Sequence, residues 1–96
     1  MNIEDVLQNA GLDVKSMSPG KKQMVINQLQ KSLYNRLVYL ITRDLDESDI
    51  NNLNELLNNE KYADFIIELD KLVPDFELKI DALAKDLVND YKLTTA

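Results

Sequence analysis

The feature that most constrains this chain is a run of apolar residues spaced three or four positions apart within residues 19–43. Its members are Ile26, Leu29, Leu33, Leu37, Leu40 and Ile41. This spacing places side chains on one face of an α-helix, because 3.6 residues make one turn. Ser18 and Pro19 precede the run; serine is a preferred N-cap, and proline suits the first helical position. The sequence therefore predicts one long helix against which the rest of the chain packs.

Helix-starting and helix-ending residues divide the rest of the sequence. Asn2 is a suitable cap for a short first helix, and Gly11 is a suitable stop. Asp46 and Asn59 stand at cap positions ahead of two further apolar runs. Pro74 breaks the pattern, because the residue before a proline is disfavoured in helical conformation. No segment alternates as a strand does. The predicted helices span 2–10, 19–43, 47–58, 60–72 and 75–91.

Length and apolar content indicate one all-α domain. A chain of 96 residues fits one domain with a modest core, and 45% hydrophobic residues are too many for a disordered chain of net charge −6. We expect a compact bundle of four main helices plus a short N-terminal helix. Domain 1–96 then comprises the first helix, a main bundle at 18–92 and a frayed tail at 93–96. The expected core is Leu29, Leu33, Leu37, Leu40, Leu53, Leu57, Phe65, Leu69, Ile80, Leu83 and Leu87, with Leu12 and Val14 buried between the first two helices.

Composition excludes several classes of function. The chain has no cysteine and no histidine, which removes thiolate nucleophiles, zinc–sulfur sites and Ser-His-Asp arrangements. Its two glycines are too few for a phosphate-binding glycine loop. The longest apolar run, 37–41, is too short to span a bilayer, and the N-terminal stretch lacks the apolar core of a signal peptide. We therefore expect a soluble cytoplasmic protein that is not an enzyme, binds no cofactor and does not enter a membrane.

One acidic stretch, DLDESDINNLNE at 44–55, places oxygen side chains where a calcium-binding EF-hand loop has them. Position 6 of such a loop needs glycine for a sharp turn, and Asp49 occupies it here. Asp46 and Asp49 also have the spacing of a capping box, and Leu45 and Ile50 that of a hydrophobic staple. We predict the start of a helix. The alternative is a calcium-responsive switch with the ligands Asp44, Asp46, Ser48 and Glu55.

Charge is divided unevenly between the two parts of the chain. Residues 1–43 carry a net charge of +3, and residues 44–96 a net charge of −9. The basic long helix is interpreted as facing the acidic half of its own fold or of a second copy, which makes a homodimer a hypothesis. The acidic half disfavours nucleic acid, whose phosphates it would repel. An alternative is an anionic partner bound by Lys21, Lys22, Lys31, Arg36 and Arg43.

A resemblance adds to this interpretation. After the long helix come LDESDINNLNELL at 45–57, Phe65, Leu69 and Val-Pro-Asp at 73–75, ahead of a last acidic helix. Over residues 18–90 the chain resembles an uncharacterised family of small, acidic, all-helical bacterial proteins, one of the domains of unknown function. The resemblance implies a helical fold and a non-enzymatic role. By elimination, we expect a protein–protein interaction module, such as an adaptor, an assembly factor or an accessory subunit, with a protein partner of unknown identity.

Overall fold

A computed structural model describes residues 2–95, which form five α-helices and two short 3₁₀ turns with no strand among them. The helices are α1 (Ile3–Asn9), α2 (Pro19–Ile41), α3 (Glu47–Asn58), α4 (Tyr62–Leu72) and α5 (Phe76–Thr95), and the 3₁₀ turns are Val14–Ser16 and Thr42–Asp44. The expected all-α fold, with four main helices and a short first helix, is confirmed at this level.

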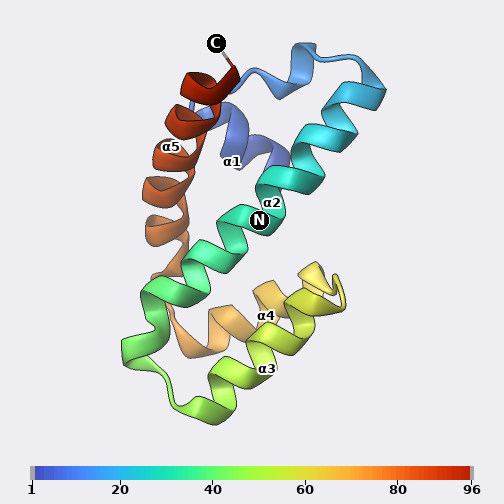
Figure 1. Cartoon of the computed structure of the whole chain (residues 1–96). Coiled ribbons are helices and arrows are strands. Elements are labelled where there is room, and N and C mark those ends of the chain that lie inside the picture. The colour runs from blue at the N-terminus through green and yellow to red at the C-terminus, as the bar shows by residue number, and fades with distance from the viewer. Residues whose placement is uncertain (1, 96) are drawn as a thin grey trace.

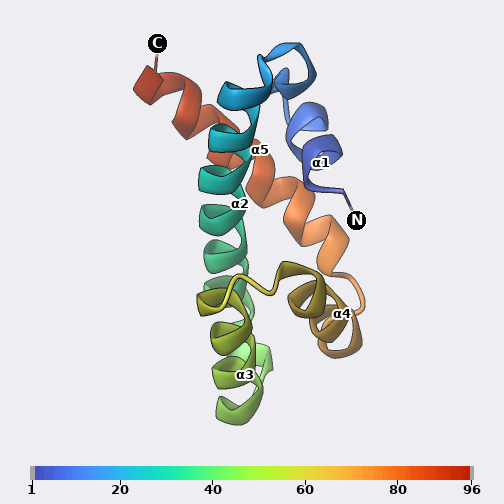
Figure 2. The same ribbon diagram turned by 90° about the vertical axis from the view of Figure 1, so that its right-hand side faces the viewer.

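The long helix α2 runs through the molecule and organises the others around it (Figure 1). α5 crosses α2, and α1 packs against both helices near the start of α2 (Figure 2). α3 and α4 form a hairpin at the opposite end, where α2 finishes. The resulting body measures 39 × 23 × 21 Å. None of the helices in residues 2–95 combines the length and the apolar character that crossing a membrane requires.

The buried face of α2 turns along the helix. Its buried row is Val25, Leu29, Leu33, Leu37 and Ile41, at steps of four residues. Each such step advances about 40° around a helix of 3.6 residues per turn. The row therefore rotates around α2 between the end covered by α1 and α5 and the end covered by the α3–α4 hairpin. The buried residues do not form one straight stripe parallel to the helix axis.

This winding corrects the expected core at Leu40, which is 50% exposed. Leu40 lies about 60° from Leu37 around the helix, on the side that the buried row has left. Leu83, also expected in the core, is only half-buried. The other nine expected core residues are buried, as are Leu12 and Val14.

Tyr34 is a core residue that the predicted set omitted. It is only 2% exposed. Its ring centroid lies 5.0 Å from that of Phe65 and 5.6 Å from that of Tyr62, with the Tyr62 ring in an edge-on orientation. Such aromatic pairs favour tilted and edge-on geometry. The three rings join the middle of α2 to the first turns of α4.

The helix starts agree with the sequence patterns only in part. Asn2 Oδ1 accepts a hydrogen bond from the Glu4 N–H at 2.9 Å, and Asp46 Oδ1 accepts one from the Asp49 N–H at 2.9 Å. Ser18 stands at the N-cap of α2 as predicted, but its side chain makes no cap hydrogen bond. Asn59 does not cap α4; it ends α3.

The helices α1 and α3 end in the same backbone motif. This motif explains why Asn59 does not cap α4 as predicted. In α1 the Leu12 N–H donates to Leu7 O at 3.1 Å, and in α3 the Lys61 N–H donates to Leu56 O at 2.9 Å. A residue with positive φ precedes each donor: Gly11 at +106° and Glu60 at +56°. These are Schellman endings. The reversal at Glu60 delays α4 to Tyr62.

α5 continues to Thr95, so the expected tail at 93–96 is helical as far as residue 95. No proline or glycine interrupts this last turn. The Thr94 hydroxyl donates to the carbonyl oxygen of Asp90 at 2.9 Å, four residues back, a bond that fits inside a helix. Residue 96 lies outside the described residues.

Candidate functional site

The most exposed large apolar residue near the end of α2 is Tyr39, and Leu40 follows it. Tyr39 is 86% exposed and Leu40 is half-exposed. Tyr39 lies on the polar side of α2, whereas Leu40 is left uncovered by the winding of the buried row. The backbone thus presents an aromatic ring and an aliphatic side chain next to each other in solvent.

Two hollows meet at this pair. One, of about 410 Å³, is lined by Asn35, Arg36, Tyr39, Leu40 and Leu83. The other, of about 460 Å³, is lined by Tyr39, Leu40, Thr42 and Arg43. Leu83 is the residue of α5 that lines the first hollow. Its position at this hollow leaves its side chain only half-buried. We call the combined set, Asn35, Arg36, Tyr39, Leu40, Thr42, Arg43 and Leu83, the Tyr39 surface.

An arginine stands at each side of the Tyr39 surface. Both Nη1 and Nη2 of Arg36 donate to Asp90 Oδ2 at 3.3 Å, an exposed ion pair between α2 and α5. Exposed pairs of this kind are weak, with a contribution of about 0.2–1 kcal/mol. Arg43 makes no ion pair within residues 2–95. The Tyr39 surface therefore offers an unpaired guanidinium group and a second one held only loosely.

The other predicted basic contacts do not gather with these arginines. Lys22 pairs with Glu4 of α1. Lys21 and Lys31 are exposed and make no ion pair in the described part of the chain. Lys31 and Arg36 are five residues apart, which places them about 140° apart around α2. Two of the five predicted contacts, Arg36 and Arg43, belong to the Tyr39 surface, and Lys22 and Arg36 contact the chain's own carboxylates.

The acidic stretch at 44–55 forms a helix start, as predicted. Asp44 ends a 3₁₀ turn, Asp46 is the N-cap, and α3 begins at Glu47. Ser48 and Glu55, two of the alternative calcium ligands, both lie in α3 and are separated by about 10 Å of helix rise. Calcium ligands lie about 2.3–2.6 Å from one ion, so the straight helix keeps these two residues from sharing it.

The carboxyl groups of Asp46 and Asp49 interact with each other at this helix start. Desolvation raises the pKa of Asp49, and the Asp46 carboxylate next to it raises that pKa further. Among residues 2–95, no three acidic side chains come together as metal ligands do. One carboxylate oxygen of Asp46, a ligand in the calcium alternative, accepts the Asp49 N–H.

Sequence reasoning missed Tyr39 and Leu83 as surface residues. A signal was present: Arg36 and Arg43, one turn to either side of Tyr39, are polar, as is Asn35. An aromatic residue among polar neighbours at helical spacing faces solvent. Leu83 gave no such signal, because its exposure depends on where α5 crosses α2.

The chain was also compared with known proteins. No protein-family model, curated protein or solved structure matches it.

Proposed function

We propose that the chain is a protein–protein interaction module, of the adaptor, assembly-factor or accessory-subunit kind, that binds an acidic partner segment through the Tyr39 surface. The observation that carries this proposal is an 86% exposed tyrosine, beside a half-exposed leucine, with an arginine on either side. Tyrosine and arginine are enriched among the residues that dominate binding energy at protein interfaces. Met24, Leu78 and Leu93 are also exposed, as single apolar residues often are.

Charge and shape define the chemistry of the partner. The hollow between Leu40 and Leu83 accepts a large apolar side chain, because its lining is aliphatic and aromatic apart from Asn35 and Arg36. Arg43 has no carboxylate of its own within residues 2–95, and a guanidinium group binds carboxylates through two donors. The partner segment therefore carries one or two large apolar side chains flanked by aspartate or glutamate.

Site-specific photocrosslinking in the native cells tests this proposal. Tyr39 is replaced by p-benzoylphenylalanine, and the same replacement at Leu93 of α5, which is 81% exposed, serves as the control. We expect a crosslink from position 39 to an acidic segment of one protein and none to that segment from position 93. Arg43→Glu should abolish the crosslink, and a lysine in place of a partner carboxylate should restore it.

Three outcomes would overturn the proposal. The first is the same set of crosslinked proteins from positions 39 and 93. The second is a crosslinked segment without carboxylates. The third is an unchanged crosslink in Arg43→Glu.

A second copy of the chain is the other candidate for the Tyr39 surface, because residues 44–96 carry a net charge of −9. Sedimentation of the purified chain at low salt separates the two candidates. A dimer that Tyr39→Ala converts to a monomer would assign the Tyr39 surface to self-association and reject the separate partner. The contacts of Lys22 with Glu4 and of Arg36 with Asp90 reduce the basic charge left for such a dimer.

A further inference from the structure

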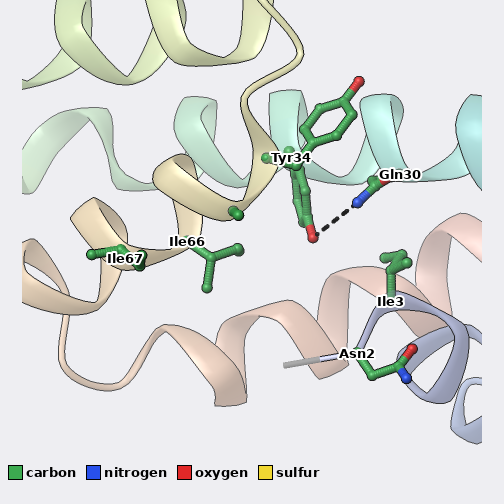
Figure 3. Close-up of a pocket in the computed structure, with 8 residues that line it drawn as sticks. Asn2, Ile3, Gln30, Tyr34, Ile66 and Ile67 are labelled. Carbon is green, nitrogen blue, oxygen red and sulfur yellow. Dashed lines mark hydrogen bonds between the residues drawn. The ribbon is translucent and has the colours of Figure 1, made fainter.

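A third hollow, of about 530 Å³, lies between the start of α1, the middle of α2 and the first half of α4 (Figure 3). Its volume falls in the range of about 300–1,000 Å³ that is typical of small-molecule sites. Its walls are mainly apolar and aromatic, and none of the described residues that line it is charged. These residues are Asn2, Ile3, Gln30, Tyr34, Tyr62, Ala63, Ile66 and Ile67.

One polar group is aimed into this hollow. The Tyr34 hydroxyl lies between Ile3 and Ile66, with the Gln30 amide beside it (Figure 3). Gln30 Nε2 donates to the hydroxyl oxygen at 3.5 Å, which is long for such a bond. The hydroxyl's own proton has no acceptor among residues 2–95. Because the hydroxyl oxygen accepts from Gln30, its proton is available to an acceptor within the hollow.

The Tyr34 hydroxyl keeps its proton at neutral pH, because burial raises the pKa of Tyr34 above its ordinary value. It can therefore donate to an acceptor bound in the hollow. An anionic acceptor is disfavoured, because none of the described residues that line the hollow is a cation. Desolvation and the charge of Glu60 also raise the pKa of Tyr62 at the edge of the hollow. A neutral oxygen acceptor satisfies the donor without bringing a second negative charge near Glu60.

We propose that this hollow binds a small, uncharged and largely apolar molecule whose carbonyl oxygen accepts a hydrogen bond from the Tyr34 hydroxyl. The side chains of Ile3, Ile66 and Ile67 cover the apolar part of the molecule. Tyr34 and Tyr39 are five residues apart and thus about 140° apart around α2. This site is therefore separate from the Tyr39 surface, and each proposal can fail without the other.

A matched pair of probes tests the role of the hydroxyl. Acetophenone has a ketone oxygen, and ethylbenzene has nearly the same shape without it. Both are titrated into the chain while the methyl resonances of Ile3 and Ile66 are followed by NMR. We expect both probes to shift these resonances and acetophenone to bind roughly fivefold more tightly, the effect of one net hydrogen bond.

Three variants make the result specific. Tyr34→Phe keeps the ring contacts with Tyr62 and Phe65 and should lower the affinity for acetophenone to that for ethylbenzene. Tyr39→Phe removes a hydroxyl outside the hollow and should leave the affinity for both probes unchanged. Ala63→Phe fills the hollow from its exposed wall and should abolish binding of both probes; because it leaves the core untouched, it remains informative if Tyr34→Phe weakens the fold.

The proposal is overturned by any of three results. The probes shift resonances elsewhere and leave Ile3 and Ile66 unaffected, Tyr34→Phe binds acetophenone as tightly as the wild type, or Ala63→Phe still binds both probes.

Discussion

At the scale of single residues, Asp46 and Ser18 occupy the same N-cap position of two helices, but only Asp46 makes the cap bond. Asp46 Oδ1 accepts from the Asp49 N–H at 2.9 Å, whereas the Ser18 hydroxyl makes no such contact. Asp46→Ala should lower the free energy of unfolding by about 1 kcal/mol. Ser18→Ala, the matched control, should lower it by clearly less. Denaturation in urea measures both.

Asp46→Ala and Glu55→Gln together decide between a helix start and a calcium switch. If Asp46 acts only as a cap, the effect of Asp46→Ala is equal in calcium and in chelator. Glu55→Gln should change stability little under either condition, whereas in an EF-hand that position supplies the bidentate ligand. A melting temperature that rises with calcium in the wild type and does not rise in Glu55→Gln would establish the metal switch.

Asp13 gives the chain a pH-dependent contact between α1 and the following 3₁₀ turn. Its carboxylate accepts from the Ser16 hydroxyl at 2.7 Å and from Gln8 Nε2 at 3.0 Å. These two bonds, Ser16 first, lower the pKa of Asp13 below its ordinary value of 3.8. A carboxyl group whose pKa is lower in the folded chain stabilises the fold above the unfolded value and loses that contribution as the pH falls through the folded value.

Asp13→Asn should therefore lower the melting temperature at pH 6, and the difference from the wild type should shrink below pH 3.8. NMR titration of the Asp13 carboxyl carbon gives the pKa directly, and Ser16→Ala should raise it. If the melting temperatures of the wild type and Asp13→Asn differed by the same amount from pH 6 to pH 2, the negative charge of Asp13 would not be what stabilises the contact.

At the scale of elements, the two Schellman endings form a natural pair, because one has glycine and the other glutamate at the positive-φ position. Gly11 has φ +106° and Glu60 has φ +56°. A left-handed conformation costs a non-glycine residue roughly 1–2 kcal/mol, part of which glycine's greater freedom in the unfolded chain offsets. Glu60→Gly should stabilise the fold by up to about 1 kcal/mol.

Gly11→Ala is the opposite member of this pair and should destabilise the fold. A Cβ at position 11 would meet only Lys92 Nζ, at 3.6 Å, an ordinary contact. The cost is therefore one of backbone conformation alone. Thermal unfolding of both variants measures the effects, and a loss of stability in Glu60→Gly would mean that the glutamate side chain stabilises this turn by more than its conformation costs.

The winding of the buried face of α2 is tested by two leucines three residues apart. Leu37 has no exposed surface, and Leu40 is half-exposed. Leu37→Ala should lower the free energy of unfolding by roughly 2–5 kcal/mol through the cavity it leaves. Leu40→Ala should cost far less, because its side chain already contacts water. Comparable losses in the two variants would place Leu40 in the core after all.

Sequence patterns predicted elements well where local chemistry decides them and less well where neighbouring helices do. Asn2, Asp46 and Pro74 mark helix boundaries through their own hydrogen bonds or ring geometry. The exposure of Leu40 could not be predicted from the local sequence, because it depends on which parts of α2 are covered by α5 and by the α3–α4 hairpin. The start of α4 depended on a positive φ at Glu60, and glutamate carries no signal for that conformation.

At the scale of the whole molecule, the candidate site could be predicted only in fragments. Arg36 and Arg43 were singled out as basic residues of the long helix, and both border the Tyr39 surface. The same criterion also selected Lys22, which contacts Glu4 instead. Charge along a sequence does not reveal which groups meet in three dimensions, and the contribution of Leu83 arises only from the crossing of α5 over α2.

The charge of the whole chain predicts how its stability responds to salt. The net charge is −6, and residues 44–96 contribute −9, so carboxylates on α3–α5 repel one another in the compact state. The attractions that oppose this repulsion include Lys22–Glu4 and Arg36–Asp90, which are partly or fully exposed and worth about 0.2–1 kcal/mol each. Salt screens both the repulsion between carboxylates and the attraction within the ion pairs. Because the unpaired carboxylates outnumber the ion pairs, we expect the loss of repulsion to dominate.

Raising sodium chloride from low to physiological concentration should therefore raise the melting temperature, because the screening length falls to about 8 Å. Asp70→Lys removes repulsion on α4 and should flatten this response. Lys31→Glu adds to the repulsion and should steepen it. Both positions are exposed and neither has an ion pair within residues 2–95, so the variants change charge with little change in packing. A melting temperature that falls with salt would instead mean that the links from α2 to α1 and α5 outweigh the repulsion, and Arg36→Gln would then abolish part of the fall.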